Sequence, residues 1–97
     1  MKISIPFNGT KADGVARIKK VLDDSSQKIA EHASDVKREW RDNVLDFAFR
    51  AQGQYIEGTV TVEDGRFDLY AKLPLALRLF EGTIERMIES EVKKLKL

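Results

Sequence analysis

Apolar and polar residues alternate along the middle of the chain, and this period of two is typical of strands with one buried face. We expect strands over residues 36–41, 45–50, 55–62 and 66–72, joined by tight turns at 42–43, 52–54 and 64–65. The Asp64-Gly65 pair in the last turn favours a hairpin. A shorter alternating stretch, Lys2–Ile5, predicts one more strand, which Pro6 closes.

Two further stretches have the spacing of three and four residues that marks one face of a helix. The first predicts a helix over residues 11–33, although Ser25 and Ser26 weaken its middle. The second, residues 73–97, predicts one long amphipathic helix that starts at Leu73-Pro74, because Pro presets the first helical turn. The core-facing residues of this second helix are expected to be Ala76, Phe80, Ile84, Met87, Ile88 and Leu95.

The order of these elements is β-α-β-β-β-β-α, which defines the fold class. It predicts a two-layer α+β domain, in which one antiparallel sheet packs its apolar face against both helices and turns its charged face to water. A chain of 97 residues is long enough for one core, so we expect residues 1–97 to form a single domain.

Composition narrows the class of protein. Hydrophobic residues make up 42% and charged residues 34% of the chain, which excludes a disordered protein. The net charge is +1 with acids and bases interleaved, and there is no cysteine for disulfide or thiol chemistry. No apolar run approaches the ~20 residues that span a bilayer. The start MKISIPFNG lacks the apolar region of a signal peptide, so we expect a cytoplasmic protein.

The chain has no pattern of catalytic, cofactor-binding or metal-ligating residues. His32 is its only histidine, and spacing supplies no partner for catalysis or metal binding. Glu81, Glu85 and Glu89 recur every four residues, which places them on one solvated face of a helix rather than in an acid–base pair. We therefore expect a protein that is not an enzyme.

Tyr55 and Tyr70 are expected on the charged face of the sheet, close to several basic residues. Aromatic side chains on an open sheet among basic residues resemble the stacking platforms of some RNA-binding domains. Asp46, Glu57 and Asp68 are interleaved there and would repel phosphates. Ion pairing across a solvated sheet explains this face better, so RNA binding is a weaker hypothesis.

Leu75 and Leu79 lie nearly opposite Phe80 and Ile84 on a helical wheel, next to Gly82. A helix that buries only one face does not need two leucines on the other, and exposed apolar area generally marks an interface. Three interpretations remain open. These residues could form a homodimer contact, dock on a partner or an apolar surface, or be covered by the first helix.

Gly58 is expected on the apolar face of the sheet, beneath the helices. Its missing side chain allows either a close approach of helix to sheet or a small apolar cavity. The residues expected around such a cavity are Trp40, Phe47, Gly58, Phe80, Ile84 and, at its mouth, Glu91.

Spaced motifs over residues 36–90 resemble those of the polyhydroxyalkanoic acid system protein family, and an outline match at Ile3–Pro6 and Ala16-Arg17-x-x-Lys20 extends the resemblance. The motifs are Trp40-x-x-Asn43-x-Leu45-x-Phe47, Gly58-x-Val60-x-Val62, Leu69-x-x-x-Leu73-Pro74 and Phe80-x-x-x-Ile84-Glu85-x-x-Ile88. Members are small bacterial proteins associated with polyester storage granules. The family has no established catalytic residues, so the resemblance implies a setting rather than a reaction. A His commonly follows the opening strand in that family, whereas this chain has Phe7.

The layout is also similar to a reduced helix-grip domain of the lipid-binding START kind, which implies an apolar ligand held between sheet and helix. Two functional hypotheses follow. The first is an accessory protein that self-associates, or docks on a storage granule or a granule protein, through Leu75, Leu79 and Gly82. The second is a small domain that binds an acyl or lipid-like molecule.

Overall fold

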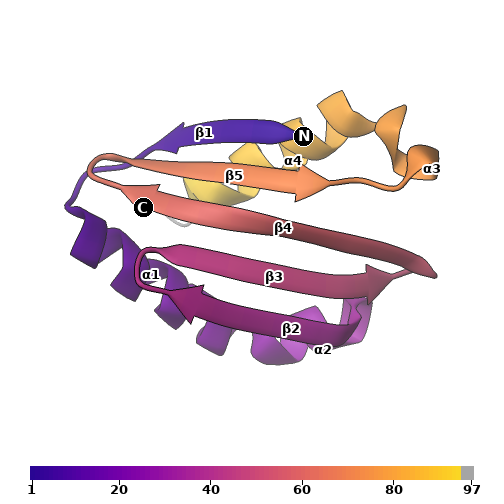
Figure 1. The fold of residues 1–97 in the computed structure, drawn as a ribbon, viewed down its shortest axis with the longest axis horizontal. Helices are drawn as coiled ribbons and strands as arrows, with labels where there is room; N and C mark the ends of the chain where they lie inside the picture. Colours follow the sequence, from indigo (N-terminus) through magenta and orange to yellow (C-terminus); the bar gives the residue numbers. More distant parts are fainter. Residues whose placement is uncertain (95–97) are drawn as a thin grey trace.

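The computed structural model describes residues 1–94, apart from the side chains of residues 91 and 94; the predicted core residue Leu95 lies outside the described residues. Nine elements follow one another along the described chain (Figure 1). They are β1 (Lys2–Pro6), α1 (Lys11–Asp24), α2 (Ser26–His32), β2 (Ser34–Arg41), β3 (Val44–Ala51), β4 (Gln54–Glu63), β5 (Arg66–Lys72), α3 (Leu75–Arg78) and α4 (Glu81–Lys94).

The five strands form one antiparallel sheet in the order β1-β5-β4-β3-β2. Strands β2 to β5 are a meander, and β1 adds to its edge beside β5. All helices lie behind the sheet in Figure 1, with α1 and α2 behind the β2 side and α4 behind the β1 side. The predicted α+β class with a single antiparallel sheet is therefore confirmed. We call α1 with α2 the first helical arm, and α3 with α4 the second.

The prediction of one uninterrupted helix over residues 11–33 is wrong, because the first helical arm breaks at Ser25. The Ser25 N–H still donates to the Val21 carbonyl at 2.9 Å, and its own carbonyl accepts from Ile29 N at 2.9 Å. Its φ and ψ of −100° and 4°, however, lie outside the helical range. Serine favours such breaks since its hydroxyl competes for backbone groups.

The prediction of one long C-terminal helix is also wrong, because α3 ends at Arg78 and α4 begins at Glu81. Bonds between residues three apart, Leu77 N to Pro74 O and Phe80 N to Leu77 O, tighten the first turn and end it. The Met1 nitrogen lies 2.9 Å from the Glu81 carboxylate, which ties the start of α4 to β1. This tertiary contact and the poor helix former Gly82 explain the interruption.

The start of α1 is bound to the β4–β5 hairpin. Thr10 and Asp13 form a reciprocal capping box, and these hydrogen bonds hold the pKa of Asp13 below its ordinary value. The Lys11 N–H donates to Asp64 Oδ1 at 2.7 Å, so a hairpin residue caps the same helix end. Helix α1 is thus held at its first turn by its own residues and by the sheet.

The core is concentrated at this end of the molecule. Phe7, Val62 and Phe67 form its buried cluster, with the Phe7 and Phe67 rings stacked at 4.3 Å. Gly14 of α1 lies directly on this cluster. A Cβ atom at Gly14 would meet Val62 Cγ1 at 2.6 Å and Phe7 Cζ at 2.7 Å, so glycine permits the close approach of α1 to the sheet.

We expect the Gly14→Ala substitution to lower the free energy of unfolding by about 1–3 kcal/mol, the usual cost of overpacking a core. Gly82→Ala is the matched control, since its Cβ would meet only Arg86 Nη1 at 3.7 Å. That control should stabilise the protein by up to about 1 kcal/mol through helix propensity. Urea unfolding of both variants measures the difference. Equal stability of the two would contradict the close approach at Gly14.

Candidate functional site

An apolar groove lies between the sheet and the two helical arms. Its volume is about 430 Å³. The sheet forms its floor, the first helical arm one wall, and α4 the other. Its lining consists of Ile5, Ile18, Val21, Leu22, Ile29, Ala33, Val36, Lys37, Arg38, Leu45, Phe47, Ala48, Phe49, Val60, Phe67, Leu69, Ile88 and Val92.

The groove exists because the helical arms close on the sheet at only one end. Gly14 is buried against the core cluster, whereas Ile18, Leu22 and Ile29 further along the first helical arm are only half-buried. Among the described side chains of α4 none is fully buried, and Ile88 and Val92 face the groove. The described side chains of the two arms therefore leave space between them.

The mouth of the groove lies at an irregular part of β2. The pairing of β2 with β3 shifts between Ser34 and Lys37, and Asp35 adopts a positive φ of 52°. Val36 at this bulge is 41% exposed although it lines the groove. Among the described residues, Lys37 and Arg38 are the charged ones in the lining, and the pairing of Arg38 with Phe47 places Arg38 on the groove side, so this edge of the groove is basic.

The predicted cavity beneath Gly58 is wrong. A Cβ atom at Gly58 would collide with the Tyr70 carbonyl oxygen and would lie 2.8 Å from Phe47 Cζ. Phe47 is the direct cross-strand partner of Gly58, so its ring covers the position that the missing side chain leaves open. The close approach that Gly58 permits is made by a neighbouring strand and not by a helix.

The residues predicted around that cavity do not gather in one place. Phe47 lines the apolar groove. Trp40 packs against the core cluster and lies under the Lys19 ammonium, 5.4 Å from the ring centre. Ile84 is half-buried, Phe80 is 56% exposed, and the side chain of Glu91 lies outside the described residues.

The second apolar feature is an exposed surface on α3 and the start of α4, which we call the α3–α4 surface. Ala76, Phe80 and Met87 were predicted to face the core, and this prediction is wrong because all three side chains are exposed. Phe80 directly precedes α4, and Met87 lies seven residues further on in that helix. The exposed fractions are 78% for Leu75, 89% for Leu79, 56% for Phe80 and 63% for Met87.

The three interpretations of Leu75 and Leu79 are reduced to two. Both side chains are largely exposed, so the first helix does not cover them, and that interpretation is wrong. Gly82, which was predicted beside them, is exposed on the first turn of α4. The other two interpretations, a homodimer contact and docking on a partner or an apolar surface, stay predictions.

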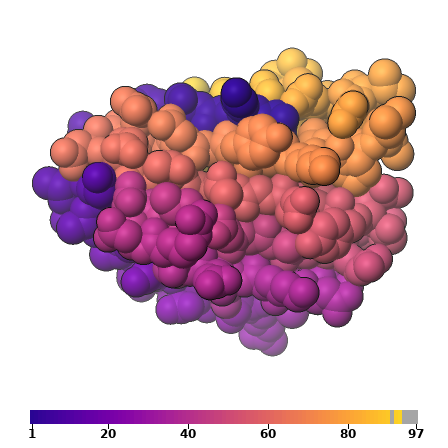
Figure 2. Space-filling view, viewed as in Figure 1, coloured from indigo at the N-terminus to yellow at the C-terminus, as the bar shows by residue number. Residues whose placement is uncertain are grey.

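The open face of the sheet, seen in Figure 2, carries polar groups that pair with one another. Arg41 donates to both Asp46 oxygens at 2.6 and 3.1 Å, which lowers the pKa of Asp46. Asp68 accepts from Ser4 Oγ at 2.7 Å and from Arg66 Nε at 3.0 Å, and these two bonds hold its pKa below the ordinary value. These pairs occupy the charges that a polyanion would need.

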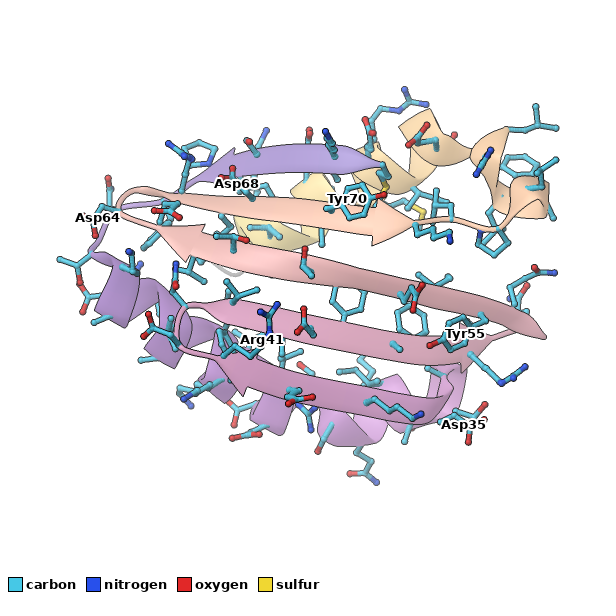
Figure 3. All side chains as sticks on the ribbon, in the orientation of Figure 1. Asp35, Arg41, Tyr55, Asp64, Asp68 and Tyr70 are labelled. Carbon is cyan, nitrogen blue, oxygen red and sulfur yellow. The ribbon has the colours of Figure 1, made fainter. Side chains whose placement is uncertain are left out.

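Tyr55 and Tyr70 lie apart on the open face (Figure 3). Tyr70 pairs with Thr59, which is four residues from Tyr55 along β4, or roughly 13 Å at the rise of a strand. Bases stacked on successive aromatic residues need a shorter separation, so this geometry disfavours the RNA hypothesis.

His32 is exposed at the last position of α2. Within residues 1–94, no three His, Cys, Asp or Glu side chains gather as ligands for a metal ion. None of the described helices has both the length and the hydropathy that a bilayer crossing requires.

These features define a small α+β domain with one polar open sheet face, an apolar groove on the other face and an exposed apolar helical surface. The model of the family described as "Putative polyhydroxyalkanoic acid system protein" matches residues 1–95, and the chain belongs to that family. No curated protein and no solved structure was found to match the chain. The likeness to a helix-grip domain stays a prediction.

The motif residues that carried the resemblance to this family are structural in this chain. Asn43 Nδ2 donates to the Val62 carbonyl at 2.9 Å, and Val62 N donates to the Asn43 carbonyl at 2.9 Å, so the β2–β3 turn is tied to β4. Leu45 and Leu73 are buried. Phe7, at the position where the family commonly has His, is a core residue stacked on Phe67.

Sequence reasoning did not identify the groove. The helical spacing over residues 11–33 runs through Ile18, Leu22, Ile29 and Ala33, and these residues form one wall. The width of the gap between the two arms depends on how the arms pack on the sheet, and no local sequence pattern predicts this packing. Arg38 had a weak signal, since it is a charged residue at an apolar position of the alternating strand β2.

We expect Gly58→Ala to destabilise the protein by about 1–3 kcal/mol, because the new methyl group would collide with the backbone of β5 and with Phe47. Thr59→Ala, on the next residue of β4, is the control and should cost less than about 1 kcal/mol. Thermal unfolding of both variants is the measurement. A stable Gly58→Ala variant would show that space does exist at this position.

Proposed function

We propose that this protein is a non-enzymatic accessory protein of the polyhydroxyalkanoate storage system that attaches to the apolar polyester surface of the granule. The observation that carries the proposal is the exposure of Leu75 and Leu79 on the α3–α4 surface, at 78% and 89%. Membership of the polyhydroxyalkanoic acid system family supplies the chemistry of the surface, an aliphatic polyester.

The position of α3 supports docking on a broad surface. In Figure 1, α3 projects beyond the end of β5 and lies level with the β3–β4 turn, so its side chains are accessible at that end of the molecule. Burying one leucine contributes roughly 1.5–3 kcal/mol, and Phe80 and Met87 offer further apolar area. Several such side chains together are sufficient for reversible attachment.

The open face of the sheet supports an accessory role over a catalytic one. Several of its acids and bases are engaged with one another, as in the Arg41–Asp46 and Arg66–Asp68 pairs. A general base or nucleophile needs a group held ready for a substrate rather than neutralised by its neighbour. The polar side therefore fits a solvated exterior of a docked protein.

We expect the double substitution Leu75→Asp with Leu79→Asp to reduce co-sedimentation with poly(3-hydroxybutyrate) particles at least about tenfold, because two charges would enter the contact. The matched control is Ser26→Asp with Gln27→Asp, which adds the same charge at the exposed first turn of α2. The control should bind the particles like the wild type, and circular dichroism should show that both variants fold.

Analytical ultracentrifugation of the same variants separates docking from self-association. The docking proposal is wrong if three results occur together: the wild type is a dimer, the leucine variant is a monomer, and both bind the particles equally. The α3–α4 surface would then be a dimer contact. Loss of particle binding in a wild-type monomer supports docking.

A further inference from the structure

We propose that the apolar groove binds one molecule of an aliphatic carboxylate, with its chain between the two helical arms and its carboxylate at Arg38. This site is separate from the α3–α4 surface, so it goes beyond the proposed function and does not depend on it.

The groove has the size and polarity of a site for an aliphatic chain. Its volume of about 430 Å³ falls within the roughly 300–1,000 Å³ of typical small-molecule sites. Apart from Lys37 and Arg38, the described residues that line it are apolar. A hydrocarbon chain gains free energy by leaving water for such a space, whereas a polar group inside it would lose hydrogen bonds to water.

The charges at the mouth select an anion. Arg38 lies opposite Phe47 in the β2–β3 pairing, so it stands on the groove side of the sheet. Lys37, the next residue, pairs with Ala48 and directs its side chain to the other face of the sheet, so Arg38 is the cation that the groove side of β2 offers. An arginine guanidinium can hold both oxygens of a carboxylate with parallel hydrogen bonds.

The acids around the mouth do not neutralise Arg38. Asp35 lies 3.4 Å from Arg50 Nε and is paired with it. Asp23 shares a shallow depression with Arg38 beside Trp40, but it makes no ion pair with it. Across the described side chains, no carboxylate oxygen lies within ion-pairing distance of Arg38 or Lys37.

Other occupants fit less well. A flat polymer surface cannot enter a groove that is recessed between two helices. The exposed helix α3 of a second copy carries one charged side chain, Arg78, which would bring a cation toward Arg38 and Lys37. An aliphatic carboxylate matches both the apolar interior and the basic mouth.

The lining also predicts where a ligand can carry a hydroxyl group. A hydroxyl near the carboxylate stays at the polar mouth, so a 3-hydroxy acid is accepted. A hydroxyl at the far end of the chain would be buried among apolar side chains without a partner, which costs about 1–3 kcal/mol.

The test is isothermal titration calorimetry with decanoate, 3-hydroxydecanoate, 10-hydroxydecanoate and decanol, all below their micelle concentrations. We expect one molecule of decanoate or 3-hydroxydecanoate per chain. We expect binding of decanol and of 10-hydroxydecanoate to be at least about fivefold weaker, because one lacks the anion and the other buries a hydroxyl.

Three variants locate the site. Arg38→Gln should weaken decanoate binding about tenfold and leave decanol unchanged, because only the charged contact is lost. Arg86→Gln is the matched control on α4, outside the groove, and should bind decanoate like the wild type. Ala33→Leu adds bulk to the groove wall and should weaken both ligands at least about fivefold.

The variant Leu75→Asp with Leu79→Asp should keep decanoate binding, so failure of the docking proposal and failure of this one are distinguishable. Absence of decanoate binding to the folded wild type overturns the inference. The inference is also overturned if Arg38→Gln binds decanoate as tightly as the wild type does, or if a folded Ala33→Leu variant does so. Tighter binding of decanol than of decanoate overturns it as well.

Discussion

The structure depends on the close contact between Gly14 of α1 and the Phe7–Val62–Phe67 cluster of the sheet. No other residue type fits there, since a Cβ atom would lie 2.6 Å from Val62. The hydrogen bond from Lys11 N to Asp64 and the Thr10–Asp13 capping box hold α1 in the same place. Because the helix is fixed to the sheet at its first turn, the core gathers at that end, and the packing loosens towards α2.

The sheet could be predicted from the sequence because each strand has its own local alternation of apolar and polar residues. Alternation along β2 to β5 and the turns between them identify every strand, and the observed sheet follows. The helix breaks could not be located in this way. Ser25 weakens a helix without dictating where it ends, and the second break depends on the contact between Glu81 and the Met1 nitrogen, two positions far apart in the chain.

The exposure of a candidate site residue could be predicted only where its position on one regular helix decides which way it faces. Leu75 and Leu79 are exposed as the wheel predicts, whereas Phe80 was misplaced because the wheel assumes one uninterrupted helix. Met87 was misplaced because it lies at the edge of the stripe that Ile84 and Ile88 define within α4. The cavity at Gly58 failed for another reason. Strand register puts Phe47 directly opposite Gly58, and an aromatic ring fills the space of a cross-strand glycine. The groove depends on the separation of two arms, which only the folded chain defines.

The groove runs from the core cluster, where Phe67 lines it, to the β2 bulge, and the α3–α4 surface lies at the bulge end of the sheet. Strand β5 ends, and β2 begins, at the end where α3 projects in Figure 1. The β2 bulge that opens the groove is near the start of that strand. A protein attached to an apolar surface through α3 would therefore keep its tightly packed end and its paired polar face directed to water. The loosely packed end, with Arg38 at the groove mouth, would lie nearer to the surface.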